Sequence, residues 1–290
     1  MVSLELLSSL DGLIWLQSGK KVGEIFHQHQ TTVSRNLKKC SQAFGVSFLK
    51  QGGAWLVEGD RQLLKLEREV HQCARFQGKA PLRLEANGWN SSVLSSPSPA
   101  GWVTGTSQVL GVEHALQLLL NHIVDAWLCP LPDAPSNHAE LSAIQLCKVP
   151  MQLLVAPGHP LLQRTDLTLE EIKHYPLQWM PAKRYPGTVA MVEKLGLQPR
   201  ATRKQTPEPE TEPPSPQASS GVVHLCCALT LSRANPALVP LALNLDAHTG
   251  VALIIRREHS NNGCISRLCS DLRKRLRHLQ QSHPGIQLLS

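Results

Sequence analysis

One stretch near the N-terminus gathers hydroxyl, amide and cationic side chains on one side of a helical pattern. Within residues 31–46, TTVSRNLKKCSQAFGV, the apolar side chains are Val33, Leu37, Cys40 and Phe44. Their spacing predicts an amphipathic helix that ends before Gly45. The opposite face holds no acid. Side chains of this kind bind base edges and phosphates, so nucleic-acid contact is the chemistry that the stretch indicates.

In a helix-turn-helix, the second helix lies in the major groove and its first turns reach the bases. The residues that we expect to contact DNA are Gln30, Thr31, Thr32, Ser34, Arg35 and Lys38. Among these residues, Arg35 is best able to discriminate between DNA bases, since a bidentate contact to guanine is typically worth about 1–3 kcal/mol. The alternative is that this helix is only the surface of a small helical bundle.

The elements around this stretch complete a recognisable arrangement. Apolar periodicity predicts helices over 4–16 and 20–27 ahead of it, and two short strands over 46–49 and 54–57 after it. The pair Gly52 and Gly53 joins the two strands in a tight turn. Three helices followed by a hairpin predict a winged helix-turn-helix.

Composition allows a basic protein with more than one domain. The chain has 290 residues and a formal net charge of +7, which is long enough for two or three cores. Cations concentrate in residues 20–50, where Glu24 is the only acid. A second basic run at 267–277 is interpreted as the solvated face of a terminal helix, with anion binding as its alternative. The N-terminus lacks the basic segment of a secretory signal, so we expect a cytoplasmic protein.

A helix predicted over 60–79 has a second apolar stripe. Its members are Leu63, Leu66, Val70 and Cys73. The spacing is typical of a dimer seam between two helices. The alternative is a helix that lies on its own domain.

Beyond Pro81, strands and helices alternate. Strands are predicted over 81–86, 101–108 and 125–131, with a helix over 112–123. This order predicts a βαβ unit and an α/β domain with a parallel sheet. Further elements are a strand over 149–157, a capped helix over 167–175, a buried strand over 251–257, a last helix over 263–281, and an exposed loop over the Pro- and Glu-rich run 207–216.

The stretch HQTTVSRNLKKCSQAFGVSFL resembles the start of the LysR-type transcriptional regulators, whose pattern reads roughly S-Q-(P/S)-A-(V/L)-S-R-x-I-x-x-L-E-x-x-L-G-V-x-L-F. The matching positions are Gln30, Val33, Ser34, Arg35, Leu37, Gly45 and Val46. NHIVDAWLCPLPD, GHPL at 158–161 and TLEEIKHYPL also resemble segments of that family, so the resemblance covers nearly the whole chain.

The resemblance implies a domain order. It comprises a winged helix-turn-helix over 1–59, a dimerising linker helix over 60–80, and a two-lobed, periplasmic-binding-protein-like effector domain over 81–290, with lobe 1 about 81–157 and 251–290 and lobe 2 about 158–250. It also implies a hydroxyl between 87 and 100 that binds an effector, for which Ser91 and Ser92 are the candidates. A flexible surface loop is the alternative for that segment.

Other constellations give weaker signals. His27, His29 and Cys40, and separately His224, Cys226 and Cys227, have side chains that bind zinc, but neither set has paired ligand spacings. We interpret the first pair of histidines as solvated and the second set as part of a buried strand. The sequence has no Gly-x-Ser-x-Gly elbow and no phosphate-binding loop with its lysine. We expect no enzyme, no metal and no cofactor.

The sequence therefore predicts a regulator that binds a double-stranded DNA operator as a homodimer or homotetramer and responds to a small effector between two lobes. The alternative is a ligand-binding or scaffold protein of the same fold whose DNA binding is lost or non-specific. It is motivated by His29, which stands where the family usually has Ser, and by the hairpin KQGGAWLVEG, which lacks the family's arginines.

Overall fold

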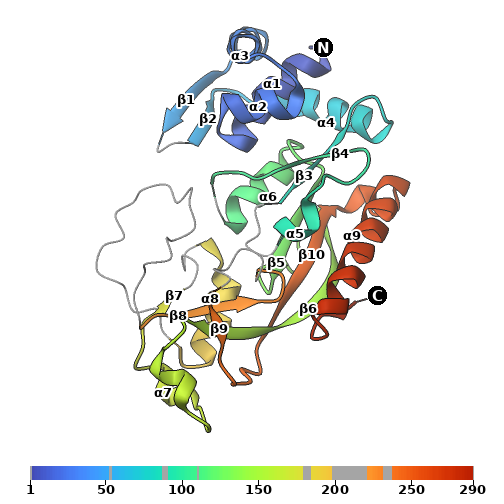
Figure 1. Cartoon of the computed structure of the whole chain (residues 1–290). Coiled ribbons are helices and arrows are strands. Elements are labelled where there is room, and N and C mark those ends of the chain that lie inside the picture. The colour runs from blue at the N-terminus through green and yellow to red at the C-terminus, as the bar shows by residue number, and fades with distance from the viewer. Residues whose placement is uncertain are drawn as a thin grey trace.

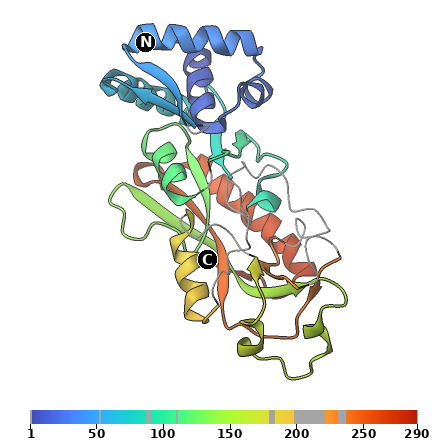
Figure 2. The same ribbon diagram turned by 90° about the vertical axis from the view of Figure 1, so that its left-hand side faces the viewer.

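The computed structural model describes residues 2–51, 54–86, 91–109, 111–178, 184–197, 221–230 and 237–289. Within these ranges, the N-terminal helices and a two-stranded hairpin lie at one end of a long curved sheet (Figure 1). A view turned by 90° keeps this arrangement, with the N-terminal unit at one end of the molecule (Figure 2). The mixed α/β fold class is confirmed.

The N-terminal unit is the predicted winged helix-turn-helix. Its elements are α1 (Leu4–Leu16), α2 (Gly19–Phe26), α3 (Gln30–Phe44), β1 (Ser47–Gln51) and β2 (Ala54–Glu58). Ser3 and Ser18 cap α1 and α2, because each side chain accepts a hydrogen bond from a backbone N–H in the first turn. Gly45 ends α3 in the left-handed conformation with φ +65°. The predicted turn at Gly52 and Gly53 lies outside the described residues.

The linker segment forms α4 (Gln62–Phe76), a single helix somewhat shorter than the predicted range. It lies beside α1 and leads into β3 (Leu82–Glu85).

The main sheet begins with the predicted βαβ unit. β4 (Trp102–Gly105) and β5 (Ala126–Leu131) both run parallel to β3, which lies between them, and α6 (Val112–Leu120) connects them. Two long strands continue the sheet in antiparallel register, β10 (His248–Arg256) and β6 (Leu141–Val155). The sheet order is β4-β3-β5-β10-β6, continued by β8 (Val223–Cys227) and then β7 (Leu177–Gln178).

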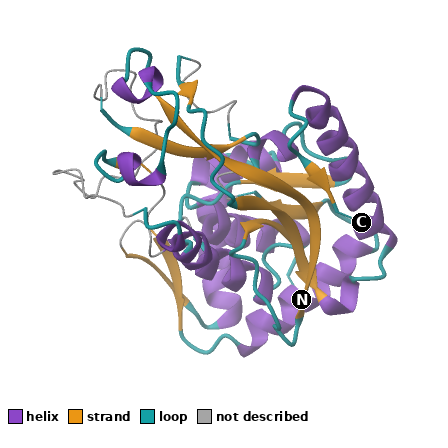
Figure 3. Cartoon of the chain, turned by 90° about the horizontal axis from the view of Figure 1, so that it is seen from below, coloured by secondary structure: helices purple, strands orange, loops and turns teal. Residues whose placement is uncertain are grey.

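The remaining strands and helices complete the described chain. The strands are β7 (Leu177–Gln178), β8 (Val223–Cys227), β9 (Val239–Pro240) and β11 (Gln287–Leu288). The helices are α5 (Ser92–Ser95), α7 (Leu169–Ile172), α8 (Pro186–Lys194) and α9 (Gly263–Ser282), with 3-10 turns η1 (Pro160–Gln163) and η3 (Arg257–His259). Seen from below, the strands cross the molecule with helices on either side (Figure 3).

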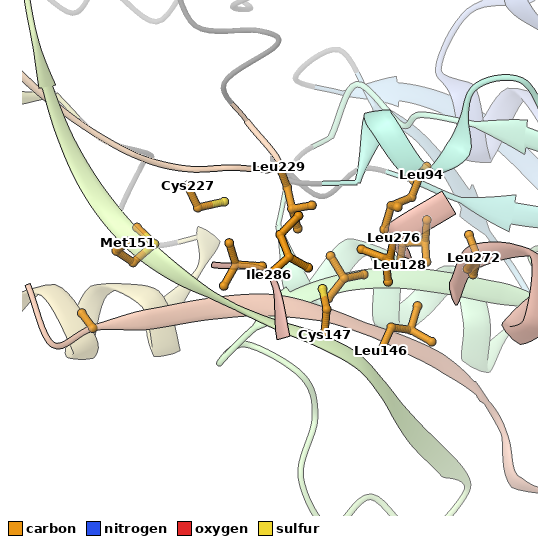
Figure 4. Packing of buried hydrophobic residues seen from close by; sticks show 14 of the residues in the cluster. Leu94, Leu128, Leu146, Cys147, Met151, Cys227, Leu229, Leu272, Leu276 and Ile286 are labelled. Atoms are coloured by element: carbon orange, nitrogen blue, oxygen red, sulfur yellow. The ribbon is translucent and has the colours of Figure 1, made fainter. Parts of the chain in front are cut away.

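Two apolar clusters fill the two faces of the sheet. On one face, Leu272 and Leu276 of α9 pack beside Leu128 and Leu146 (Figure 4). On the other face, the cluster contains residues of α6 together with Leu13 and Trp15 of α1. A helix of the N-terminal unit is therefore part of the core against the large sheet.

Two elements differ in their bounds from the sequence prediction. The strand predicted over 149–157 begins earlier, at Leu141, because a β-bulge opposite Val251 and Ala252 breaks the alternation that would have revealed it. The helix predicted over 167–175 is a single turn with a capping box between Thr168 and Glu171. The strand that contains Cys226 and Cys227 is confirmed as β8. The loop predicted over 207–216 lies outside the described residues.

Candidate nucleic-acid interface

Helix α3, the predicted recognition helix, is held from one side. Val33 and Cys40 are buried against α1 and α2, and Asn36 Nδ2 donates a 2.9 Å hydrogen bond to Ser9 Oγ of α1. His29, at the N-cap of α3, makes no side-chain capping bond. The inward residues therefore fix the rotation of α3 and leave its opposite face open.

The open face carries the predicted DNA-contacting residues. The exposed ones are Gln30, Thr31, Ser34, Arg35 and Lys38, whereas Thr32 is half-buried. In Figure 1, α3 lies at the far side of the N-terminal unit from the large sheet. The structure thus places this set together on one accessible surface.

A hollow of about 450 Å³ lies beside the start of α3. Its polar lining includes Gln17, Lys20, Ser34, Lys50 and Gln108. Lys20 and Lys50 belong to the basic cluster of residues 20–50, but the sequence does not predict that they line an interface. Gln108 comes from the loop after β4, and no signal in the sequence indicates that this loop lies near α3.

The outer face of the hairpin, which forms the wing, includes two exposed leucines. Leu49 and Leu56 are paired across β1 and β2, and they are 47% and 43% exposed. Phe48 and Val57 face inward, against the cluster that α1 and α3 share. Its two described strands contain one cation, Lys50, whereas a DNA-binding wing presents several cations to phosphates.

Helix α4 has two unlike faces. Its outward face contains the predicted seam residues Leu63, Leu66 and Val70, which are 63%, 52% and 47% exposed, and the exposed Cys73. Its inward face is mostly polar, and its buried members are Leu64, Arg68, His71, Gln72 and Arg75. The usual arrangement of a surface helix is therefore reversed.

Ion pairs join the inward face of α4 to the large sheet. Arg75 donates from Nε and Nη2 to the two carboxylate oxygens of Asp125, both at 2.8 Å, and the same carboxylate accepts from Gln72 Nε2 at 2.9 Å. Burial lowers the pKa of Arg75, and the attraction of Asp125 more than offsets it, so the pKa lies above its usual value. Asp125 also accepts from the backbone N–H of Arg83.

A histidine lies in the same junction. His122 Nδ1 is 2.6 Å from Gln72 Oε1, and its Nε2 is 3.5 Å from Glu69 Oε1. Burial, together with the nearby Arg256, lowers the pKa of His122 to about 4. His122 is therefore neutral at pH 7.

The structure constrains the candidate effector residues. Ser91 is buried just beyond β3, and its hydroxyl donates to the Ala86 carbonyl oxygen at 2.9 Å. Ser92 begins α5, but its side chain lies outside the described residues. A larger hollow of about 630 Å³ lies elsewhere, lined by residues of β5, β6 and β10, and Ser91 is not part of its lining.

The possible zinc sets do not gather. His27 and His29 are exposed, whereas Cys40 is buried in the N-terminal core and burial raises the pKa of its thiol to about 12. Among the described residues, no group of three or more His, Cys, Asp or Glu side chains has the geometry to hold a metal ion. In the same part of the chain, no helix is both long and apolar enough to cross a membrane.

Comparisons with known proteins agree with this architecture. A family model described as the LysR substrate binding domain matches residues 107–277. A structure of an OxyR cysteine variant from Corynebacterium glutamicum with bound H2O2 is 15% identical, covers 99% of this chain and 97% of that one, and has a TM-score of 0.53. No curated protein sequence matches this chain significantly.

Two further solved structures give the same result. Full-length OxyR from Pseudomonas aeruginosa, also a cysteine variant, is 17% identical, with coverages of 94% of this chain and 98% of that one and a TM-score of 0.54. Full-length CbnR complexed with its target DNA is 12% identical, with coverages of 94% and 99% and a TM-score of 0.50. At such identities, these likenesses establish the fold alone.

Proposed function

The chain belongs to the family of LysR-type transcriptional regulators, and on that premise we propose that it is a sequence-specific DNA-binding regulator in the cytoplasm. A small effector would prefer one arrangement of the subunits and so change how the paired recognition helices fit an operator. The effect is limited by the difference in the effector's affinity for the two arrangements.

The observation that carries this proposal is the exposed face of α3. Arg35 and Lys38 lie there with hydroxyls and an amide at the first turns, and the helix core behind them is buried. A helix with this geometry presents its entry end to base edges and its later cations to phosphates. The face is held in place by contacts to α1, so little ordering accompanies binding.

Replacing Arg35 with Ala tests the base contact. Arg35→Ala should weaken binding to the specific operator by about 1–3 kcal/mol, roughly 5- to 150-fold, and leave non-specific binding much less affected. Lys38→Ala should weaken binding to all sequences alike and reduce the salt slope by about one. Both are measured by DNA titration at several salt concentrations.

Lys79→Ala supplies the matched control. Lys79 is exposed and lies beyond α4, so its removal changes the net charge as Arg35→Ala does but leaves α3 intact. Equal, small effects of all three substitutions would contradict the assignment of α3 as the reading helix.

We infer that two copies pair through the outward face of α4, as a homodimer or within a homotetramer. Leu63, Leu66 and Val70 form an apolar stripe that is exposed to about half or more in the described part of the chain. A stripe of this spacing packs well against a second helix. Pairing would bring two α3 helices to two half-sites of an inverted repeat.

We expect a small effector to bind near Ser91, because of the family and because of the position of Ser91 in the sheet. Ligands of α/β domains bind beyond the carboxyl ends of parallel strands, and Ser91 follows β3 at such an end. Thermal unfolding against a metabolite panel tests this, since a bound ligand raises the melting temperature. A hit whose shift is lost in Ser91→Ala would support the site, and a hit unaffected by it would place the ligand elsewhere.

One observation favours the alternative, a ligand-binding or scaffold protein with lost or non-specific DNA binding. The wing exposes Leu49 and Leu56 on its outer face, and such side chains cannot neutralise phosphates. This alternative predicts no operator preference in wild type, so the Arg35→Ala comparison separates the two functions.

A further inference from the structure

Helix α1 is buried on two sides, which sets it apart from an ordinary surface helix. One side packs on α3, where Leu7 and Leu10 share a cluster with Cys40. The other side lies on the large sheet and α6, where Trp15 and Leu16 are 0% exposed. An apolar helix of this kind must be covered all round. The same helix therefore contacts both the recognition helix and the effector-domain sheet.

The contact with the sheet is closely fitted at Gly105 of β4. A Cβ at this position would lie 2.4 Å from Trp15 Cζ2 and 2.7 Å from Leu16 Cδ2. Trp15 Nε1 donates a hydrogen bond to the Glu85 carboxylate, which also accepts from the backbone N–H of Ser107 at 3.3 Å. Glycine is thus needed at 105 for α1 to lie where it does.

A buried carboxylate, one turn before Trp15, also holds α1 in place. Asp11 accepts from Arg68 of α4 at 2.8 Å and from Arg83 of β3 at 3.1 Å, and all three side chains are buried. Arg83 also donates to Ser8 Oγ at 2.9 Å and to the Ile123 carbonyl oxygen at 2.9 Å. Separating α1 from the sheet would leave these charges without their partners, so the arrangement resists opening.

We call this contact of Asp11, Trp15 and Leu16 with Arg83, Glu85 and Gly105 the dock. This inference rests on the proposed DNA-binding function. We propose that Asp11 and Trp15 are positioning residues. Through them, the dock fixes each recognition helix relative to the effector domain of its own chain. Because Glu85 lies at the carboxyl end of β3, a ligand-driven change there passes directly through α1 to α3.

Gly105→Ala tests the dock without altering any residue of the DNA-facing surface. The added methyl group should push α1 off the sheet. Gly221→Ala is the matched control, since a Cβ there meets nothing within 4 Å. Hydrogen exchange followed by mass spectrometry should show faster exchange in residues 4–16 and 82–85 of Gly105→Ala, with Gly221→Ala equal to wild type. Unchanged exchange in Gly105→Ala would overturn the dock.

A second readout separates positioning from simple stability. Half-sites are presented to the full-length protein with spacers of varied length, and bound DNA is sequenced. Wild type and Gly221→Ala should enrich one narrow spacing. Gly105→Ala should enrich the same half-site with a broad range of spacings. An identical narrow spacing in Gly105→Ala would overturn the positioning role. Failure of the wild-type protein to enrich any half-site would refute the proposed function. In that case the hydrogen-exchange result alone would test whether the dock exists.

Trp15→Phe covers the case in which Gly105→Ala does not fold. It retains an aromatic ring but removes the donor to Glu85. Its exchange and spacing distributions should shift in the same direction as those of Gly105→Ala, by a smaller amount. Distributions equal to wild type would count against Trp15 as a positioning residue.

Discussion

The two faces of α4 are opposite in character and in surroundings. The inward face is polar and buried, with Arg75 paired to Asp125 and Arg68 paired to Asp11. The outward face is apolar and exposed, with Leu63 at 63%. In a globular monomer, polar residues usually face the solvent and apolar residues the core.

This difference fits the two contacts that we infer for the helix, one within the chain and one between two copies. The inward face needs specificity of position, which paired charges and directed hydrogen bonds supply. The outward face needs affinity for a partner, which apolar area supplies. Substitutions on the two faces should therefore affect different measurements, namely the stability of one chain and the association of two.

The largest effect is expected on the inward face. Asp125→Ala leaves Arg75 buried without its carboxylate, and we expect a loss of about 3–5 kcal/mol in the free energy of unfolding. Urea unfolding followed by circular dichroism measures it. The exposed Asp166→Ala is the matched control and should change stability by no more than about 0.5 kcal/mol.

A second substitution separates the effect of the unpaired Arg75 charge from the effect of lost packing. Adding Arg75→Met to Asp125→Ala removes the unpaired charge, so the double variant should be more stable than Asp125→Ala alone. A double variant that is less stable than either single one would show that the loss comes from packing.

The outward face should show the next largest effect. Leu66→Glu places a charge in the proposed seam, so the dimer dissociation constant should rise on the order of 100-fold or more, with the far-ultraviolet spectrum unchanged. Sedimentation velocity over a concentration series measures it. Lys65→Gln changes the net charge by the same amount outside the stripe and should leave association unaltered. Equal dimer dissociation constants for Leu66→Glu and wild type would show that the two copies do not pair through this face of α4.

A smaller effect concerns pH. The pKa of His122 in the folded chain is lowered to about 4. As pH falls from about 6.5 to 4, this histidine therefore becomes protonated in the unfolded chain but stays neutral in the folded chain. Stability is therefore lost over this window. His122→Asn should flatten the decline by up to about 1.4 kcal/mol per pH unit, as measured by urea unfolding at a series of pH values.

The control for that measurement is His27→Asn. Both histidines have left-handed backbone angles, with φ +56° for His122 and +53° for His27, and asparagine tolerates this conformation. His27 is exposed and lies outside the junction between α4 and the large sheet, so His27→Asn controls for the change of residue type at a left-handed position. Parallel pH profiles for His122→Asn and wild type would argue against this histidine as a source of acid sensitivity.

Local patterns in the sequence predicted much of the fold. The stripe of Val33, Leu37 and Cys40 located α3, and alternation with turn signals located β1 and β2. The long strand β6 was missed in its first half because Leu146 and Cys147 are both buried, which breaks the period of two at the bulge.

Long-range contacts could not be predicted in this way. The pairing of Asp11 with Arg83 joins residues far apart in the chain, and no spacing rule connects them. From the sequence alone, the polar residues of the inward face of α4 would be predicted to face the solvent. One signal for the dock was present, because Trp15 and Leu16 make α1 apolar beyond the single stripe that a helix covered on one side requires.

Binding of the wild-type protein to fragments of its own genome, selected at two salt concentrations and sequenced, tests the central claim most directly. The account predicts enrichment of a short inverted repeat, with affinity that falls as salt rises. Recovery of random fragments, or of none, would contradict it and leave the polar face of α3 as a solvated surface.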